Sequence, residues 1–359
     1  MLVRIGAFVT QYTSAEVWEG TLPPAVAPSF DSSTVYLYPT IAAADRGVMA
    51  GGSGFVVGIP FDGREDVWHL YVVTNRHVVE DAKSRVIRVN TTAHRSVAIP
   101  SDLGEWTCAA NDDIAVLPFT PPADWLPGLI SVDMFLDETC EIGGWPLFPG
   151  DEAIFFGRFV NHEGHQRNKP VVRFGNISML PDASALVRVG DINQLAFLVE
   201  CRSLGGFSGS PAFVQLSDRR WMGTDPRWAG AAKQRGPIPT RVPKFLGVDC
   251  AHLPFWSPVC KEKEPKTKIP EMWSETNSGM AVVIPAWRLL SLINQEKLVE
   301  ERKRDESAAA KRGTASAAAV PDALAPDDVP FTKDDFEQAL KKVARKLPDS
   351  GAKLAKATK

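Results

Sequence analysis

The sequence predicts an all-β protein built from two β-barrels or two β-sandwiches. Two series of short strand-like runs, one within residues 33–119 and the other within residues 172–285, are separated by frequent turn signals. The 27 glycines and 28 prolines agree with the many turns that such a fold requires. No repeat of about 33 to 45 residues is present, which argues against a solenoid or a propeller.

Runs rich in β-branched, aromatic and aliphatic residues are expected to form the strands. The first series is STVYLY (33–38), GFVVGIP (54–60), WHLYVVTNRHVV (68–79), SRVIRVN (84–90) and DIAVLPF (113–119). The second series is VRFGNISML (172–180), LAFLVE (195–200), PAFVQL (211–216), KFLGVDC (244–250) and GMAVVIP (279–285). Each series supplies about five or six strands, enough for one barrel or sandwich.

The C-terminal part of the chain changes period. Residues 285–306 predict a closing helix whose apolar face consists of Leu289, Leu290, Ile293 and Leu298. Residues 307–330 are rich in Ala and Pro and predict a flexible linker. Thr332 can cap a further helix, whose apolar stripe is Phe336, Leu340, Val343 and Leu347. A single helix of this length is marginal in water, so we expect it to dock on a partner.

The composition gives no sign of a nucleic-acid or membrane partner. The formal net charge of −3 exerts no overall attraction toward polyanions. Residues 1–20 show no secretory signal, and no run approaches the roughly 18 apolar residues of a membrane-spanning helix. The five cysteines are an odd number at wide spacing, so reduced thiols and a cytoplasmic location are expected. No cofactor is expected, and Cys250, His252 and Cys260 lack the C-x-x-C pair typical of zinc, so no metal is expected either.

The stretch GFSGSP (206–211) is the strongest candidate for chemistry. It leaves one strand-like run, turns tightly and enters the next. Gly206 and Gly209 can adopt backbone conformations that other residues resist, so the turn can expose one side chain and direct successive N–H groups at one point. A nucleophilic hydroxyl beside an oxyanion hole needs that arrangement. Ser208 is the residue so placed.

A nucleophilic serine needs a base, and the base needs an orienting partner. His77 lies in VVTNRHVV at the end of an apolar strand, and Asp113 lies in NDDIAVL at the start of another. Taken alone, a histidine after a strand is usually structural, and an aspartate before a strand is usually a solvated turn residue. Three such residues together, each at a strand end in one β-rich chain, favour a Ser-His-Asp arrangement.

These segments resemble those of the trypsin-like (chymotrypsin-fold) serine peptidases. TNRHVV is similar to the family's T-A-x-H-V/C-V segment, DDIAVL to its D-I-A-L/V-L segment and GFSGSP to its G-x-S-G-x-P motif, in the family's order. GGSGFVV (51–57), GGWP (143–146) and NSGMAVVIPAWRLLSLI (277–293) resemble further family segments. The resemblance covers roughly residues 30–296, and the tail from residue 297 has no counterpart in it.

The resemblance implies two packed six-stranded β-barrels with a triad in the cleft between them, a C-terminal helix, and a flexible tail carrying a short extra helix. Ser208 would attack the scissile carbonyl, His77 would move the proton to the leaving amine, and Asp113 would orient the imidazole. The N–H groups of Gly206 and Ser208 would form the oxyanion hole.

The expected organisation of the chain follows from the resemblance and the tail. It is an N-terminal extension (1–29), a first barrel (30–125), a second barrel with the closing helix (126–300), a flexible linker (301–330), and a short amphipathic helix with a basic tail (331–359).

Phe207 departs from the family pattern. It stands where the digestive enzymes carry an aspartate that pairs with a freshly cut N-terminus, and a phenyl ring cannot make that ion pair. We therefore expect no activation by that route. The ring either orders the oxyanion loop by packing or holds it shut.

By resemblance, Arg202 lies at the base of the primary specificity pocket, and Asp249, Cys250, His252 and Gly279 line it. Arg202 would favour an acidic substrate side chain through charge-assisted hydrogen bonds. Alternatively, Asp249 neutralises Arg202 and the pocket takes small or neutral side chains.

Two insertions interrupt the second series of strands. Residues 253–276 would lie at the pocket mouth, where Trp256 and Trp273 either gate access or are half-buried in a surface loop. Residues 217–243 combine basic and tryptophan side chains and are read as a solvated loop rather than a partner-docking or nucleic-acid surface.

The sequence therefore predicts a serine endopeptidase acting on a protein or peptide substrate. One alternative is a non-catalytic binding module that keeps the fold, against which the intact triad argues. The other is an esterase with the same chemistry. A protein partner is expected for the C-terminal helix, with no membrane and no nucleic acid.

Overall fold

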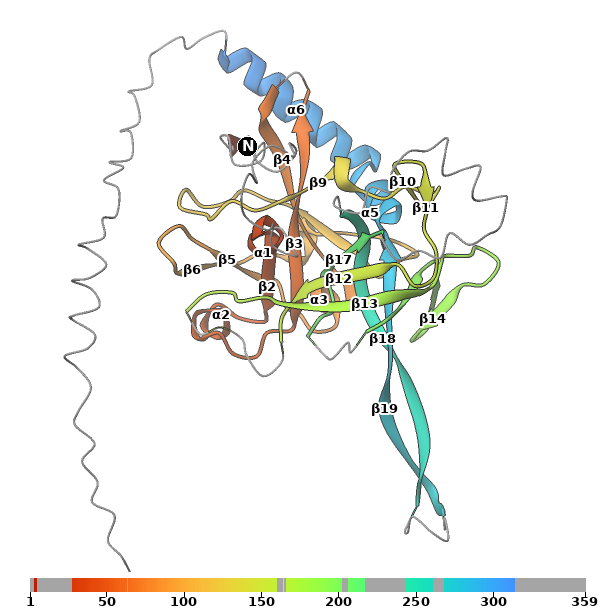
Figure 1. Ribbon diagram of the computed structural model, residues 1–359. Helices are drawn as coiled ribbons and strands as arrows, with labels where there is room; N and C mark the ends of the chain where they lie inside the picture. Colours follow the sequence, from red (N-terminus) through yellow and green to blue (C-terminus); the bar gives the residue numbers. More distant parts are fainter. Residues whose placement is uncertain are drawn as a thin grey trace, which may run out of the picture. The chain divides into compact units, whose positions relative to one another are not determined.

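The computed structural model describes residues 3–4, 28–62, 64–159, 164, 166–201, 206–216, 243–260 and 268–313 (Figure 1). Residues Met1–Arg312 group as one compact unit, and Gly313–Lys359 group as another. The amphipathic helix predicted within 331–359 and most of the insertion 217–243 lie outside the described residues. The predicted domain boundaries therefore stay predictions.

The first series of strands forms a nine-stranded sheet with the path β6-β5-β2-β3-β4-β8-β7. Its members on this path are β2 (Thr34–Tyr38), β3 (Gly52–Phe61), β4 (Arg64–Thr74), β5 (Val86–Asn90), β6 (Ser96–Ile99), β7 (Thr107–Cys108) and β8 (Ala115–Pro118). Off this path, β1 (Val3–Arg4) pairs with β4 and β9 (Ile130–Ser131) pairs with β3. The expected six-stranded barrel is thus a longer curved sheet, whose path ends at β6 and β7 among the described residues.

The second series forms a closed six-stranded barrel, as expected, in the order β12-β13-β16-β19-β18-β17. Its strands are β12 (Glu152–Gly157), β13 (Val171–Met179), β16 (Phe197–Glu200), β17 (Pro211–Gln215), β18 (Lys244–Cys260) and β19 (Lys268–Pro285). Two short hairpins accompany it, β10 (Glu141–Ile142) with β11 (Trp145–Pro146) and β14 (Val187–Val189) with β15 (Ile192–Gln194). The all-β prediction is confirmed.

One apolar cluster joins the sheet to the barrel. Alternate residues of the barrel strands face either the barrel interior or the sheet, as the period of two in a strand requires. Phe55 of the sheet and Phe213 and Phe245 of the barrel belong to the shared cluster, and the ring centroids of Phe55 and Phe245 are 5.3 Å apart. Burying one such side chain contributes about 1.5–3 kcal/mol. The sheet and the barrel are therefore packed on each other, and residues at their junction are held by both.

Helices are few and short except at the C-terminal side. They are α1 (Pro28–Ser33), α2 (Ile41–Arg46), α3 (Arg76–Glu80), α5 (Ala286–Ile293) and α6 (Glu296–Gly313), with 3-10 turns at Leu103–Glu105 and Val132–Met134. In the part of the chain that the structure describes, no helix has the length and apolarity needed to cross a membrane.

The run 68–79, predicted as one strand, divides into a strand and a helix. Strand β4 ends at Thr74, Asn75 takes the N-cap position, and α3 carries His77 in its first turn. The apolar alternation of the strand stops at Asn75, whose side chain donates to the Asp113 carbonyl instead. His77 therefore lies one helical turn beyond the strand end.

The predicted closing helix over 285–306 is two helices. The break falls at Asn294 and Gln295, where Arg302 donates to the Ile293 carbonyl at 2.8 Å and to the Asn294 side chain at 2.9 Å. Helix α6 then continues to Gly313, so residues 301–313 are helical where the linker was predicted to begin. The low content of bulky apolar residues predicts flexibility there, but Ala, Glu, Lys and Arg all favour helix.

The insertion 253–276 is a two-stranded ribbon rather than a loop. Strands β18 and β19 continue beyond the barrel and pair with each other as far as Cys260 and Lys268 (Figure 1). Trp256 and Trp273, which are 53% and 60% exposed, therefore lie on paired strands and not in a loop. We call residues 253–260 and 268–278 the arm.

Candidate active site

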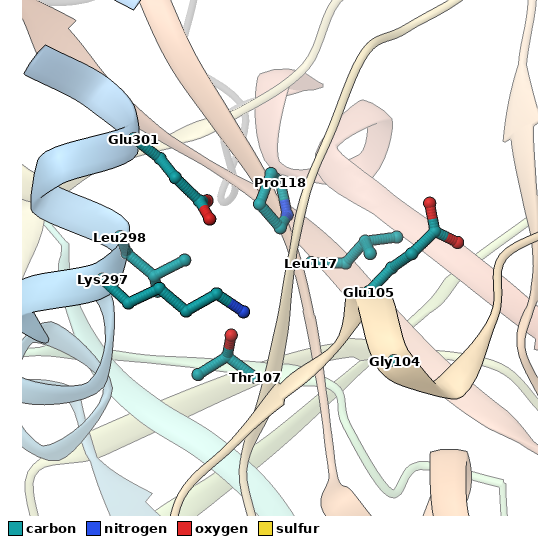
Figure 2. A pocket seen from close by; sticks show the side chains of 8 residues that line it. All are labelled: Gly104, Glu105, Thr107, Leu117, Pro118, Lys297, Leu298 and Glu301. Carbon is teal, nitrogen blue, oxygen red and sulfur yellow. The ribbon is translucent and has the colours of Figure 1, made fainter. Parts of the chain in front are cut away.

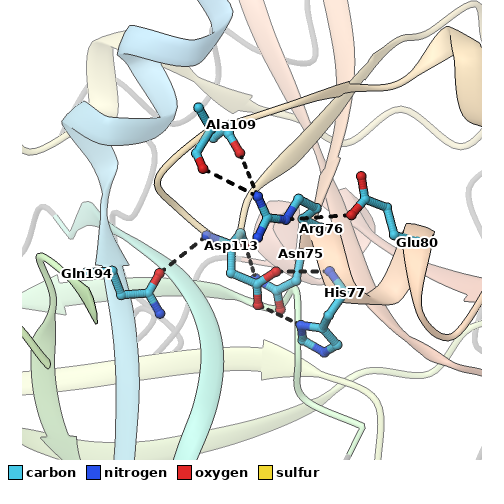
Figure 3. Close-up of polar contacts among 8 residues, drawn as sticks. Asn75, Arg76, His77, Glu80, Ala109, Asp113 and Gln194 are labelled. Carbon is cyan, nitrogen blue, oxygen red and sulfur yellow. Dashed lines mark hydrogen bonds and ion pairs between the residues drawn. The ribbon is translucent and has the colours of Figure 1, made fainter. Parts of the chain in front are cut away.

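His77 and Asp113 are joined by two hydrogen bonds at the junction of sheet and barrel (Figure 3). His77 Nδ1 lies 2.6 Å from Asp113 Oδ2, and the His77 backbone N–H donates to Oδ1 at 2.9 Å. The carboxylate can only accept, so Nδ1 carries the ring proton and Nε2 presents a lone pair. The imidazole is 37% exposed and the carboxylate 9%, so the ring reaches solvent while its partner is buried. This is the geometry of an oriented base.

Groups from two segments, residues 75–76 and Gln194, hold the turn that carries Asp113. Asn75 Nδ2 donates to the Asp113 carbonyl at 2.8 Å, and the Asp113 N–H donates to Gln194 Oε1 at 3.3 Å. Arg76 ties α3 to the same turn by donating to the Ala109 carbonyl at 3.2 Å. Figure 3 shows these side chains converging on the His77–Asp113 pair. The carboxylate is thus fixed through its backbone as well as through the imidazole.

The neighbouring Asp112 is anchored from the C-terminal side of the barrel. Arg288 of α5 places Nε at 2.9 Å and Nη2 at 2.7 Å from Asp112 Oδ2. The Asp112 side chain is 6% exposed and its Oδ1 has no hydrogen-bond partner among the described residues. Arg288 therefore compensates a buried carboxylate directly beside the one that orients His77.

Ser208 lies in a tight turn, residues 206–210, which we call the nucleophile loop. Gly206 and Gly209 have φ of 95° and 84°, the left-handed region in which a side chain is strained. Ser53 of β3 donates its N–H to the Ser208 carbonyl at 2.9 Å and its hydroxyl to the Gly206 carbonyl at 2.8 Å. On the other side, the Gly209 N–H donates to the Asp249 carbonyl at 2.8 Å. The sheet and the barrel each hold this loop.

The same contacts bring Ser208 to the segment that carries His77. Thr74 donates its hydroxyl to the Ser53 carbonyl at 2.7 Å, one residue before Asn75 caps α3. A Cβ on Gly52 would lie 2.7 Å from the Val78 side chain and 3.2 Å from the Ser208 carbonyl, so Gly52 lies between α3 and the nucleophile loop. The structure thus gathers all three predicted triad members at one place.

No hydrogen bond joins Ser208 Oγ to His77 Nε2, both of which are described. Such a bond is often long before substrate binds. Within the described residues, no backbone carbonyl accepts from the N–H groups of Gly206 and Ser208. The carbonyls of the same two residues are held by Ser53, which fixes the peptide planes on that side.

Phe207 packs into the barrel core. It is 1% exposed, and the Arg173 guanidinium lies 4.5 Å from its ring centroid. A Cβ on Gly157 would lie 2.7 Å from the phenyl ring, so the glycine leaves room for it. Of the two roles considered for Phe207, these contacts favour ordering of the nucleophile loop by packing.

The predicted pocket residues are brought together only in part. Arg202 lies outside the described residues, so its pairing with Asp249 stays a prediction. Asp249 is fully buried, and burial holds the pKa of its carboxyl well above the usual range, while the Arg173 guanidinium offsets part of that shift. Asp249 Oδ1 has no hydrogen-bond partner among the described residues. Among the described residues, Arg173 is the positive charge that acts on the Asp249 carboxyl.

Cys250 lies beside the triad, whereas His252 lies farther along β18. Gln194 Nε2 donates to Cys250 Sγ at 3.3 Å, and burial, followed by the charge of Asp113, holds the pKa of this thiol well above its usual range. Gly279 has φ of 82°, and a Cβ there would lie 3.9 Å from the Cys201 carbonyl oxygen, an ordinary van der Waals contact. Among the described side chains, no group of three or more His, Cys, Asp or Glu could hold a metal.

Sequence reasoning missed the residues that hold the triad. Ser53, Gln194 and Arg288 reach the site through long-range contacts, and nothing in the local sequence marks Gln194 or Arg288 as site residues. Ser53 alone carried a sequence signal of a role in the site, because it lies inside GGSGFVV, a segment that resembles one of the family's.

A separate hollow of about 300 Å³ lies elsewhere on the molecule (Figure 2). Its walls come from α6, the turn before β7, and β7 and β8, and Lys297, Glu301 and Glu105 supply the charges. No member of the triad lines it.

Comparisons with known proteins give distant matches. No family model matches the chain, and no curated protein matches it. Among solved structures, the MamO protease domain from Magnetospirillum magneticum has 16% identity and a TM-score of 0.40, covering 75% of this chain and 100% of its own. The HtrA-type protease AlgW with decapeptide has 16% identity and a TM-score of 0.36, covering 70% and 52%. The active form of the Rv3671c protease from M. tuberculosis has 15% identity and a TM-score of 0.36, covering 74% and 81%.

All three TM-scores are below 0.5, so the fold assignment rests on the closed barrel, the packed sheet and the order of the site-bearing segments in this chain. The chain has an all-β fold in which a closed six-stranded barrel packs on a nine-stranded sheet.

Proposed function

We propose that this protein is a serine endopeptidase that cleaves peptide bonds through an acyl-enzyme. Ser208 Oγ attacks the scissile carbonyl while His77 Nε2 takes the hydroxyl proton, and the N–H groups of Gly206 and Ser208 stabilise the oxyanion. His77 then gives the proton to the leaving amine, and the acyl-enzyme forms as the peptide bond breaks. Water, deprotonated by His77, hydrolyses the ester and restores Ser208. Asp113 stabilises the imidazolium at both stages.

The observation that carries this proposal is the 2.6 Å contact between His77 Nδ1 and Asp113 Oδ2. It leaves Nε2 as the free base, and Ser53 and Thr74 link the nucleophile loop to the strand end that precedes His77. A structural histidine would satisfy both ring nitrogens within the protein. Here the described residues provide a partner for Nδ1 only.

Labelling with a fluorophosphonate tests the proposal. Intact-mass analysis should find one adduct on the wild type, none on Ser208→Ala, and a rate lower by several orders of magnitude on His77→Ala. Because Ser208→Ala removes only a partly exposed hydroxyl, a thermal melt equal to that of the wild type shows that the loss is chemical. No adduct on a folded wild type would contradict the proposal.

The two alternatives give different results in the same assay. A non-catalytic binding module would form no adduct yet bind protein. An esterase would form the adduct and hydrolyse small esters, but would leave an unfolded protein substrate intact. Cleavage of reduced, carboxymethylated α-lactalbumin, followed by mass spectrometry of the products, separates peptidase from esterase.

A cytoplasmic location is also proposed, since an odd number of widely spaced cysteines favours reduced thiols. Thiol labelling in intact cells, compared with labelling after fractionation, tests it. A protein partner for the helix predicted within 331–359 stays a prediction, which pull-down with and without that segment would test.

A further inference from the structure

We infer that Gln194 is a positioning residue that holds the base and the nucleophile of the proposed peptidase in one frame. The inference rests on the proposed function and deepens it, by naming the side chain that joins the two halves of the site. Gln194 makes its two hydrogen bonds with a backbone N–H and a thiol. It therefore acts through the segments that it joins, and not on the reacting atoms.

The amide of Gln194 bridges the sheet and the barrel. Its Oε1 accepts from the Asp113 N–H at 3.3 Å, in the turn that leads into β8 of the sheet (Figure 3). Its Nε2 donates to Cys250 Sγ at 3.3 Å, in β18 of the barrel. Gln194 and Cys250 are each 2% exposed and Asp113 is 7% exposed, so water does not compete for either bond.

The barrel end of this bridge leads to the nucleophile loop. Cys250 follows Asp249, whose N–H donates to the Ser210 carbonyl at 2.9 Å and whose carbonyl accepts from the Gly209 N–H at 2.8 Å. These two bonds fasten the nucleophile loop to β18. One side chain thus links the strand that holds the nucleophile to the turn that orients the base.

Gln194 is itself fixed by the core. It is the last residue of the hairpin formed by β14 and β15, where it lies opposite Val187. Val187 and Ala196 flank the base of this hairpin, and both belong to the apolar cluster that joins the sheet to the barrel. An amide locked at such a place by packing can set the distance between two segments, which a mobile surface side chain cannot do.

The site depends on such links because the base and the nucleophile do not bond each other directly. With no hydrogen bond between Ser208 Oγ and His77 Nε2, their alignment comes from the segments that carry them. Removing the Gln194 amide would leave the buried Asp113 N–H without its acceptor, and the turn would shift toward another one. A displacement approaching about 1 Å slows a reaction by up to about 100-fold. We therefore expect the chemical step, and not substrate binding, to depend on Gln194.

Reaction rates are the first test. Gln194→Met keeps the length of the side chain and removes both hydrogen bonds. It should lower kcat for reduced, carboxymethylated α-lactalbumin and the fluorophosphonate labelling rate by about 10- to 100-fold, with KM unchanged. Gln194→Glu should recover most of the rate, because a carboxyl oxygen can still accept from the Asp113 N–H.

The matched control is Asn168→Leu. Asn168 is also 2% exposed, and its amide links the chain before β13 of the barrel to the Arg88 carbonyl of the sheet at 2.6 Å, away from the triad. Its loss should lower Tm, as Gln194→Met does, but should leave kcat unchanged. If Asn168→Leu lowers kcat as much as Gln194→Met, the role of Gln194 is merely structural and the inference fails.

The other end of the bridge gives an independent test. Cys250→Ala removes the acceptor of Gln194 Nε2 but leaves the Asp113 N–H paired, so this variant should fold even if Gln194→Met does not. It should label more slowly than the wild type. Gln194→Met/Cys250→Ala should label as slowly as Gln194→Met alone, because one link is lost in both proteins. Labelling of Cys250→Ala at the wild-type rate, or losses that multiply in the double variant, would overturn the inference.

Proton NMR supplies a measurement that does not require turnover. In the Ser208→Ala background, the proton of the short bond between His77 Nδ1 and Asp113 Oδ2 should resonate far downfield, assigned by its absence after His77→Ala. Gln194→Met should shift this resonance and Asn168→Leu should not. A resonance that Gln194→Met leaves in place would overturn the inference. If the wild type forms no fluorophosphonate adduct and yet Gln194→Met shifts the resonance, the proposed peptidase fails and the positioning role stands.

Discussion

Replacing Arg288 by methionine should both destabilise the protein and slow the chemistry at a distance. Arg288 supplies two donors to Asp112 Oδ2, at 2.9 and 2.7 Å. Methionine keeps most of the side-chain volume but leaves the Asp112 carboxylate, which is 6% exposed, without its cation. The turn that carries Asp113 would then move to bring Asp112 to water.

The size of the effect follows from burial. Leaving one member of a buried ion pair alone costs about 3–5 kcal/mol. The Arg288 side chain is 36% exposed, so water already screens the pair, and about 2 kcal/mol is the better expectation. For a protein of this size, that lowers Tm by roughly 5 °C. A shift of Asp113 approaching 1 Å would slow the reaction by up to about 100-fold.

The assay pairs thermal melts with labelling and hydrolysis rates. Arg288→Lys keeps the charge and should recover part of both losses, while Arg288→Met/Asp112→Asn should recover Tm because no charge is left unpaired. If Arg288 positions Asp113, kcat falls with KM unchanged. The matched control is Arg188→Met, since Arg188 is 74% exposed and pairs with an exposed Asp191 at 3.8 Å. Surface pairs of that kind contribute about 0–1 kcal/mol, so little should change.

Two outcomes would refute this reasoning. An unchanged Tm in Arg288→Met would show that Asp112 carries no buried charge that needs compensation. A lower Tm with a labelling rate equal to that of the wild type would show that the pair stabilises the fold without positioning Asp113.

Three other substitutions test single features of the site and core. Asp249→Asn should raise Tm at pH 7. Burial raises the pKa of the Asp249 carboxyl in the folded protein, so the stability that protonated Asp249 contributes is full below the unfolded pKa of 3.8 and is lost as pH rises toward the folded pKa. The gain in Tm should therefore vanish near pH 3, where Asp249 is protonated in both states. Gly209→Ala should abolish fluorophosphonate labelling, because a Cβ would lie within 2.1 Å of the Ser53 carbonyl and φ is 84°. His69→Gln should reduce the loss of stability on acidification. Burial lowers the pKa of His69 in the folded protein, and the hydrogen bond to Glu306 partly offsets that shift. The stability that neutral His69 contributes is therefore present above the unfolded pKa of 6.5 and is lost as pH falls through the folded pKa.

Each of these has a result that would count against it. A gain in Tm for Asp249→Asn that is equal at pH 3 and pH 7 would contradict the first prediction. Fluorophosphonate labelling of Gly209→Ala at the wild-type rate would contradict the second. An unchanged loss of stability on acidification in His69→Gln would contradict the third. Differential scanning fluorimetry from pH 3 to pH 8 covers both titration experiments.

Sequence patterns predicted the parts of this fold that depend on local composition. Runs such as 54–60 and 211–216 lie in strands and are mostly buried, and their β-branched and aromatic residues are what marks them as strands. The Gly206–Gly209 turn was also a local signal, since both glycines take positive φ. The gathering of His77, Asp113 and Ser208 came from motif order and not from any property of the three residues alone.

The failures have a common physical cause. The arm has exposed residues on both faces, so its strands lack the alternation that signals a half-buried strand. The break at Asn294 depends on Arg302 reaching back to the Ile293 carbonyl, a contact that local helix propensity does not contain. Local sequence likewise does not contain the contacts of Gln194 and Arg288, which reach the site from distant segments.

Ser53 shows why the site needs both halves of the fold. It belongs to the sheet, yet its N–H and hydroxyl hold the carbonyls of Ser208 and Gly206, and its own carbonyl accepts from Thr74 at the strand end before His77. In the digestive enzymes of the family that this chain resembles, an ion pair orders the corresponding loop. Here neutral hydrogen bonds and the buried Phe207 ring take that place. These contacts require no newly cut chain end, so order in this loop should depend on how the sheet and the barrel hold it, with the Arg173 guanidinium over the Phe207 ring contributing.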